Sequence, residues 1–271
     1  MKFFSQVCLV HFADGPFRAT VTDINRSLAE TLKLTGPALI ADQGTLKTVC
    51  EILLSIITKT HSCQKDFGDE EELGLLEETS EFDWHAIDSA LDVVIAVAVV
   101  LNGTFAELWK MYEKPILKFV SGSDPKERST SVGVIAECIK AMGNSVTPFT
   151  TILLKPLLHR MSDEDSETKS NAAYAIGLLQ QNSTNDQEIL KSFPAILGKL
   201  EPLLNTDEAR CKDNAAGCVS RMIMRHPAKT PTAQILPALM DILPLRDDYD
   251  ENEPVYEMIV KLCKSFRPAR V

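Results

Sequence analysis

Apolar residues recur with a helical period along the chain. Between Ala172 and Leu179, alanine, isoleucine and leucine residues fall on one side of an α-helix. A similar apolar stripe runs from Ala215 to Ile223. No segment alternates apolar and polar residues with the period of two that a half-buried β-strand requires. The pattern therefore predicts an all-α protein.

The two stripes are copies of one repeated unit. Asn-Ala-Ala begins at Asn171 and again at Asn214, 43 residues later, and each copy follows an apolar helix and an acidic patch. Weaker copies place Thr130 and Glu253 at the equivalent position, so the spacings are 41, 43 and 39 residues. Two amphipathic helices that recur every ~40–47 residues are typical of HEAT and armadillo repeats. We therefore expect a right-handed solenoid of about six antiparallel helix pairs.

The expected pairs form a single array over residues 1–271. Their first helices are expected near 2–12, 44–62, 104–121, 145–161, 187–204 and 232–243. Their second helices are expected near 17–34, 84–103, 126–142, 166–181, 207–225 and 251–265. Terminal repeats normally carry a polar outer face, and the array starts abruptly at Lys2. We therefore expect this chain to be the C-terminal part of a longer protein.

An acidic segment interrupts the second helix pair. Residues 66–83 contain nine carboxylates and neither lysine nor arginine. Such a segment carries too little apolar surface to offset the entropy of ordering it. We expect a mobile loop between the two helices of this pair.

The net charge and the positions of the cysteines indicate the kind of partner and the cellular compartment. The net charge of −10 disfavours nucleic acid and anionic membranes as direct ligands and favours a basic partner. Five of the seven cysteines lie inside apolar helical runs, where a free thiol behaves as a small hydrophobic group, so we expect the cytosol or nucleus. The longest apolar run, Val93 to Leu101, is shorter than the ~20 residues that a membrane-spanning helix needs.

Catalytic and cofactor-binding patterns are absent from the sequence. The five histidines are scattered, without partners at ligand spacing or a nucleophile motif. The sequence also lacks a glycine-rich phosphate loop. We expect neither enzymatic activity nor a cofactor or metal ion.

Polar residues on the second helices define a candidate binding face. In a solenoid the second helices stack side by side and line the concave wall, so the sides opposite their apolar stripes face one groove. Three successive second helices contribute candidate residues to this groove. These residues are Glu167, Asn171 and Tyr174, then Asp207, Glu208 and Asn214, then Glu253 and Tyr256.

Two interpretations of these residues are open, and they are compatible. The asparagines either bond to the neighbouring repeat or hold the backbone of an extended peptide, since an amide both donates and accepts hydrogen bonds. The carboxylates either cap helix N-termini or bind the lysines of a ligand. Tyr174 and Tyr256 can cover a lysine stem or take a cation on the ring face.

The chain resembles the C-terminal end of the karyopherin-β (importin-β) family over essentially its whole length. The helix pairs, the acidic loop and the segments "CKDNAAGCVSRMI" and "LPLRDDYDENEPVYEMIVKL" carry the resemblance. It implies a nuclear import receptor that shuttles between cytoplasm and nucleus and carries histones and ribosomal proteins. It also implies that Ran-GTP and nucleoporins bind the full-length receptor, mostly through regions outside this chain.

The resemblance further implies where cargo binds. Members of the family hold basic, lysine-rich localisation segments with their inner helices. The family's asparagine, acidic and aromatic positions fall on Asn171, Tyr174, Asp207, Glu208, Asn214, Glu253 and Tyr256. A HEAT scaffold, such as a phosphatase regulatory subunit, is the alternative function. It would hold folded proteins, and salt-dependent binding of a lysine-rich peptide distinguishes the two functions.

Overall fold

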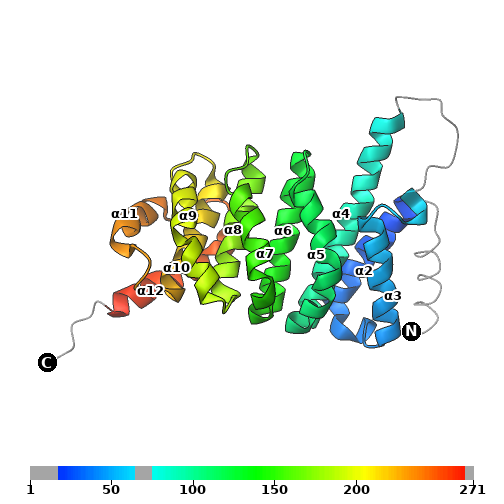
Figure 1. Ribbon diagram of the computed structural model, residues 1–271, viewed down its shortest axis with the longest axis horizontal. Helices are drawn as coiled ribbons and strands as arrows, with labels where there is room; N and C mark the ends of the chain where they lie inside the picture. Colours follow the sequence, from blue (N-terminus) through cyan, green and yellow to red (C-terminus); the bar gives the residue numbers. More distant parts are fainter. Residues whose placement is uncertain (1–17, 65–74, 266–271) are drawn as a thin grey trace. The chain divides into compact units, whose positions relative to one another are not determined.

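The computed structural model describes residues 18–64 and 75–265, and within these ranges it contains helices and turns but no β-strand. The all-α prediction is confirmed, and Figure 1 shows the succession of helices. The chain divides into two compact units, Met1–Phe119 and Val120–Val271. The helix expected near residues 2–12 lies outside the described residues. The single array over residues 1–271 stays a prediction.

The first unit is built from four described α-helices. They are α2 (Arg18–Thr35), α3 (Gln43–Ile57), α4 (Leu75–Leu101) and α5 (Ala106–Val120). Three short 3-10 helices connect them, at Gly36–Leu39, Ser62–Gln64 and Asn102–Phe105. Helix α4 packs against both α2 and α3. The Tyr112 hydroxyl on α5 donates a hydrogen bond of 2.9 Å to the Cys50 carbonyl on α3, and this bond connects α5 to α3.

Helix α4 is the core helix of this unit. The stretch Asp83–Val120 is long and apolar enough to cross a membrane by length and composition alone. Half of its most apolar window is nevertheless buried inside the protein. Ile87, Leu91 and Val94 on α4 are fully buried. Their burial accounts for the apolar composition without a membrane.

Part of the expected acidic loop is helical. Helix α4 begins at Leu75, so the expectation of a loop over residues 75–83 is wrong. Carboxylates in the first turns of a helix are favoured by the helix dipole, and an acidic sequence is therefore compatible with helix here. Residues 66–74 of the expected loop lie outside the described residues.

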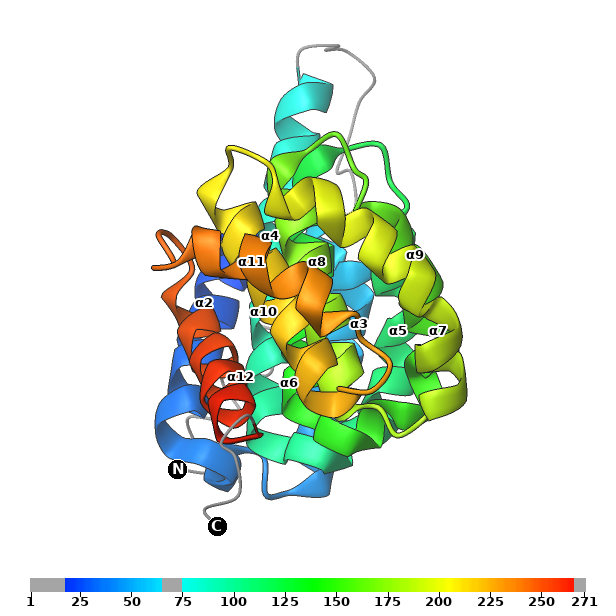
Figure 2. The same ribbon diagram turned by 90° about the vertical axis from the view of Figure 1, so that its left-hand side faces the viewer.

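The second unit consists of two layers of helices. One layer, called here the second-helix layer, contains α6 (Pro125–Met142), α8 (Ser166–Asn182), α10 (Ala209–Arg225) and α12 (Asn252–Ser265). The other contains α7 (Thr150–Arg160), α9 (Asp186–Leu204) and α11 (Thr232–Ile242), with a 3-10 helix at Gly143–Phe149 ahead of α7 and another at Tyr249–Glu251 ahead of α12. Each helix packs on the next helix of its own layer, and Figure 2 shows α7 and α9 side by side. These helices lie close to the predicted ranges.

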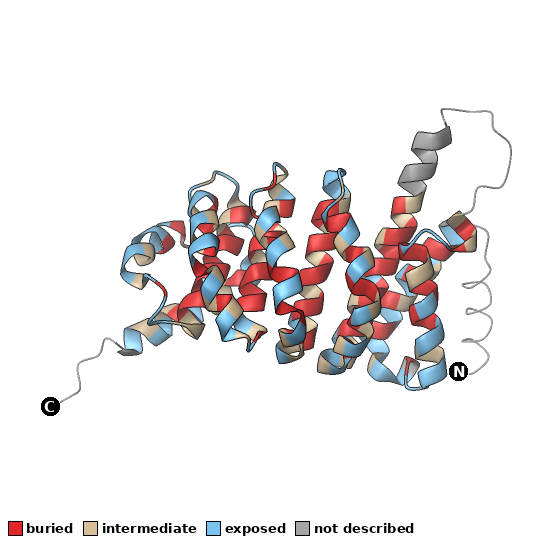
Figure 3. Cartoon of the chain, viewed as in Figure 1, coloured by how far each residue is buried: buried red, intermediate tan, exposed pale blue. Residues whose placement is uncertain are grey.

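Small residues let the helices of the second-helix layer approach closely. The alanines and larger apolar residues of the predicted stripe on α8 are fully buried, and Figure 3 shows buried residues along α8 and α10. A Cβ atom added at Gly177 on α8 would lie only 2.9 Å from the Cys218 Cα atom on α10. The repeated alanines therefore serve packing, as predicted.

Candidate functional site

Acidic side chains gather where α8, α10 and α12 begin. The three helices are successive neighbours in the second-helix layer and run in the same direction. Glu167 lies in the first turn of α8, Asp207 and Glu208 directly precede α10, and Glu253 lies in the first turn of α12. All four side chains are exposed. Each of these four predicted residues thus lies at the N-terminal end of its own helix. The row they form is offset, because Glu251 pairs with Arg221 in the second half of α10, and Glu253 therefore lies further along α10 than Asp207 and Glu208.

These four carboxylates have no ion-pair partner among residues 18–64 and 75–265. Glu208 occupies the N-cap position of α10, but its side chain accepts no capping hydrogen bond. The capping interpretation therefore does not account for Glu208. The four exposed carboxylates can therefore accept hydrogen bonds from a ligand.

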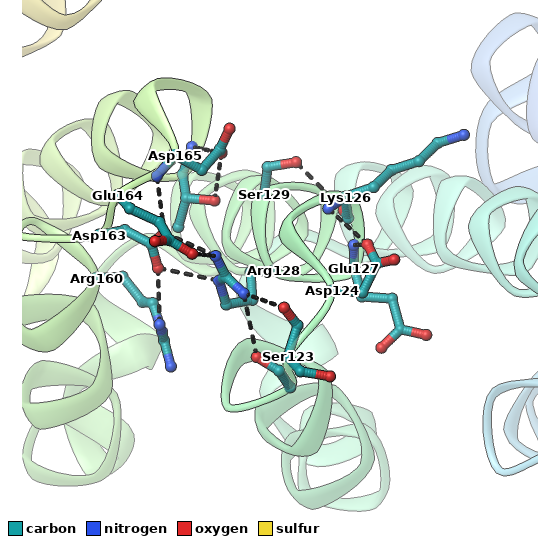
Figure 4. A network of polar contacts seen from close by, with 12 residues as sticks. Ser123, Asp124, Lys126, Glu127, Arg128, Ser129, Arg160, Asp163, Glu164 and Asp165 are labelled. Carbon is teal, nitrogen blue, oxygen red and sulfur yellow. Dashed lines mark hydrogen bonds and ion pairs between the residues drawn. The ribbon is translucent and has the colours of Figure 1, made fainter.

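Two other carboxylates at the start of α8 hold the fold together (Figure 4). Asp163 accepts hydrogen bonds from Arg128, with Nε–Oδ2 and Nη2–Oδ1 distances of 3.0 and 2.9 Å. Arg160 Nη1 lies 2.7 Å from Asp163 Oδ2. Asp165 is the N-cap of α8 and accepts from the Thr168 backbone N–H at 2.7 Å. For Asp165 the capping interpretation is confirmed.

The ionisation of Asp163 follows from these contacts. Burial by itself would raise the pKa of this carboxyl group. The hydrogen bonds from Arg128, the Asp165 backbone and Arg160 outweigh burial and lower the pKa to about 2. Asp163 is therefore ionised at neutral pH and already neutralised by two guanidinium groups, so it is not available to a ligand.

The repeated asparagines connect neighbouring helices. The Asn171 side-chain amide donates to the Ser129 carbonyl of α6 over 3.0 Å. The Asn214 amide donates to the Ser170 hydroxyl of α8 over 2.9 Å. Asn171 is half-buried and Asn214 is only 1% exposed. The structural interpretation of the asparagines is confirmed, and the expectation that Asn214 lies on a free side of its helix is wrong.

The loop between α11 and α12 covers that side of α10. Oδ2 of Asp213 accepts hydrogen bonds from the backbone N–H groups of Arg246, Asp247 and Asp248, at 3.0, 2.7 and 2.9 Å. Asn214 Nδ2 also donates to the Asp248 carboxylate over 3.2 Å. Asp213 and Asn214, which lie about one turn into α10, thereby hold the loop along this helix.

A buried ion pair fixes the end of the same loop. Arg221 on α10 donates to both carboxylate oxygens of Glu251, and both side chains are at least nine-tenths buried. The carboxylate lies over Gly217, because a Cβ atom added there would collide with it. Gly217 and Arg221 are therefore covered as well.

The two candidate tyrosines differ in their surroundings. The Arg221 guanidinium lies 5.7 Å from the centre of the Tyr174 ring, so this ring already carries a cation. Burial, reinforced by Glu137 and opposed by Lys140, raises the pKa of the Tyr174 hydroxyl to about 12. Tyr256 is 45% exposed. Only Tyr256 presents an open ring.

Sequence reasoning missed Asp213 and Glu251. Both are charged, and both are buried by partners about 30 or more residues away along the chain. The available signal was a carboxylate and a glycine one turn apart on α10, at Asp213 and Gly217. That signal points to a buried contact but does not identify the partner.

Sequence comparison relates the chain to importins, although no protein-family model matches it. The chain is 36% identical over 231 residues to the probable importin subunit beta-4 of Schizosaccharomyces pombe, which aligns 82% of this chain with 22% of that protein. It is 30% identical over 238 residues to human importin-4, covering 86% of this chain and 22% of that protein. The chain therefore spans about a fifth of the length of these relatives.

Solved structures share the fold. The karyopherin Kap121p bound to the SUMO protease Ulp1p matches 98% of this chain and 25% of its own length, with a TM-score of 0.74 and 14% identity. Kap121p bound to RanGTP matches 96% of this chain and 24% of its own length, again with a TM-score of 0.74 and 14% identity. The paired helices, the similarity to two importins and the fold shared with Kap121p show that this chain belongs to the importin-β family of karyopherins and has its HEAT-repeat solenoid fold.

Proposed function

We propose that this chain takes part in nuclear import by holding a basic, lysine-rich segment of cargo on the second-helix layer of its second unit. Histones and ribosomal proteins are the proposed cargo, and the receptor moves between cytoplasm and nucleus. The names of the relatives as importins and the Kap121p complexes with Ulp1p and RanGTP support this proposal. Ran-GTP and nucleoporins are proposed partners of a longer receptor, mostly through regions outside this chain.

One observation carries the proposal. Glu167, Asp207, Glu208 and Glu253 are exposed at the N-terminal ends of three adjacent helices and have no ion-pair partner among the described residues, whereas Asp163 is paired with two arginines. Asp163 and Glu251, which stabilise the fold, are paired within it. The four exposed carboxylates of the row have no such partner in the described part of the chain, and a lysine-rich segment supplies donors for them.

The chemistry of lysine fits this row. An ammonium group offers three donors and no acceptor, so it matches closely spaced carboxylates. A charge-assisted hydrogen bond contributes about 1.5–3 kcal/mol, and an exposed pair contributes less because water and salt screen it. The open ring of Tyr256 adds a face on which a lysine stem can lie. Several weak contacts of this kind favour a segment with several lysines.

Three of the predicted site residues are buried or half-buried, so the proposed cargo face is smaller than the sequence predicts. Asn171 and Tyr174 are half-buried and border the row, so they contribute at most at its margin. Asn214 is covered by the α11–α12 loop and is removed from the proposed contacts. The proposed cargo face therefore consists of Glu167, Asp207, Glu208, Glu253 and Tyr256.

Charge reversal at the start of α10 tests the proposal. The double variant Asp207→Lys/Glu208→Lys should bind a lysine-rich peptide at least about tenfold more weakly, because two acceptors become repulsive cations. The matched control is Glu201→Lys/Asp241→Lys, which makes the same change of net charge at exposed positions on α9 and α11. Isothermal titration measures the affinities, and circular dichroism checks helicity.

The same experiment separates the two candidate functions. Equal binding by both folded double variants would reject the cargo face. Capture of folded partner proteins without binding of any basic peptide would favour the HEAT scaffold. Loss of binding only in the α10 variant would support the import function.

A further inference from the structure

We propose that Asp213 is a positioning residue of the cargo face. It sets the position of the first turn of α12, and with it the distance between the carboxylates at the start of α10 and Glu253 on α12. This inference rests on the proposed function. Asp213 itself is 1% exposed and does not touch the ligand.

The first support is the way Asp213 holds the loop. A single carboxylate oxygen accepts three consecutive backbone N–H groups, from Arg246 to Asp248. Three bonds to successive residues fix both the position and the orientation of that backbone segment. Because the Asp213 carboxylate is buried, water has little access to the acceptor, and its loss leaves three part-buried N–H groups without this partner.

The second support is the anchor at the other end of the loop. Glu251 is paired with Arg221 and lies against Gly217, so its position relative to α10 is fixed. Glu251 directly precedes α12, which begins at Asn252. Glu253 and Tyr256 follow within the first turns of α12. The two anchors on α10 therefore determine where these two cargo residues lie.

The third support is the weak packing of α12 itself. Within the described part of this helix only Val255 and Met258 are buried, whereas α10 buries twelve residues. A helix with so narrow a buried stripe is positioned by its contact with α10 together with the connection that precedes it. The loop anchors therefore add a constraint at the start of α12 that its own packing does not supply.

The distance between these carboxylates bears on which cargo segments bind. Asp207 and Glu208 stand at the start of α10, and Asp213 lies one turn further along the same helix. Helix α10 therefore follows directly on Asp207 and Glu208 and, through Asp213, positions Glu253 on α12. A cargo segment with two lysine clusters should bind best when the spacing between its clusters matches this fixed distance.

Three variants test the inference. Asp213→Asn weakens the acceptor of the three N–H groups, and Gly217→Ala displaces the Glu251 carboxylate without changing any charge. The control is Asp124→Asn at the exposed N-cap of α6, where Asp124 accepts backbone N–H groups from Lys126 and Glu127. The probes are synthetic peptides with two lysine pairs separated by glycine–serine spacers of increasing length, and a peptide with one lysine pair.

We expect the two variants to lose the preference for one spacer length and to keep their ability to bind a lysine pair. The parent chain should prefer one spacer length, and Asp213→Asn and Gly217→Ala should bind that peptide about tenfold more weakly, the effect of about one misaligned charge-assisted hydrogen bond. Both should bind the peptide with one lysine pair as the parent does. Hydrogen exchange of the amides of residues 246–248 should accelerate in Asp213→Asn and stay unchanged in Asp124→Asn.

The outcomes that overturn the inference are distinct from failure of the proposed function. If the parent chain binds no lysine-rich peptide, the proposed function fails and the inference fails with it. If the parent binds and discriminates, but both variants keep the same preference, Asp213 does not position the face and the proposed function survives. Unchanged amide exchange in Asp213→Asn would also overturn the inference.

Discussion

Asp163 and Asp207 show how one residue type serves two purposes in this chain. Asp163 is enclosed by Arg128 and Arg160, while Asp207 is exposed and has no ion-pair partner within residues 18–64 and 75–265. The difference lies in the neighbours that the fold brings to each position. A carboxylate can therefore be assigned to stability or to binding only when its partners are known.

Loss of the Asp163 charge should destabilise the second unit. Asp163→Asn leaves two guanidinium groups without their partner, and removal of one member of a buried pair costs about 3–5 kcal/mol. Asp207→Asn is the control and should change the free energy of unfolding by less than about 0.5 kcal/mol. Urea unfolding followed by circular dichroism measures both. Equal stabilities of the two variants would contradict the structural role of Asp163.

The stability of the parent chain should fall in acid through Asp163. Its folded pKa of about 2 lies below the ordinary value near 3.9, so folding favours the ionised form. This contribution, roughly 2–3 kcal/mol, is complete above about pH 5 and is lost as the pH falls towards 2. Unfolding midpoints across this range should show a steeper acid loss in the parent than in Asp163→Asn. Parallel profiles would exclude a linked titration of Asp163.

At the scale of the element, the sequence predicted most of the helices because their apolar residues repeat with a strong helical period. The ends of α8 and α10 agree closely with the expected ranges. The start of α4 was missed, because a run of carboxylates has no apolar period to reveal a helix. The loop over α10 was missed for another reason. Its anchors join Asp213 and Arg221 to residues 30 or more positions away, and local patterns carry no information on such contacts.

Gly177→Ala tests how closely α8 and α10 approach, and Gly198→Ala is its control. Alanine favours a helix over glycine by about 1 kcal/mol when space permits. At Gly198 on α9 nothing lies within 4 Å of an added Cβ atom, so Gly198→Ala should stabilise the protein by up to about that amount. At Gly177 the added atom would press on the Cys218 backbone, and Gly177→Ala should destabilise by about 1–3 kcal/mol. Thermal unfolding measures both changes, and stabilisation by both would show that α8 and α10 can separate at no cost.

At the scale of the whole molecule, charge acts in two ways. The net charge of −10 attracts a basic ligand from a distance, wherever the individual carboxylates lie. The row at the starts of α8, α10 and α12 acts only on contact. Long-range attraction mainly changes the rate of association, whereas contacts mainly change the rate of dissociation. Kinetics can therefore separate a specific face from general acidity.

The two double variants with equal charge should differ in kinetics. Glu201→Lys/Asp241→Lys lowers the overall negative charge but leaves the row intact, so it should slow association of a lysine-rich peptide about two- to threefold and leave dissociation unchanged. Asp207→Lys/Glu208→Lys should slow association similarly and accelerate dissociation about tenfold, because contacts made only in the complex are lost. Stopped-flow fluorescence with a labelled peptide measures both rates. Raising the salt concentration from about 50 to 300 mM should abolish the slower association of both variants relative to the parent, because the screening length shortens from about 14 to about 6 Å. The difference in dissociation should persist at high salt. If both variants changed only the association rate, binding would reflect general acidity, and the row of carboxylates would not be a specific cargo face.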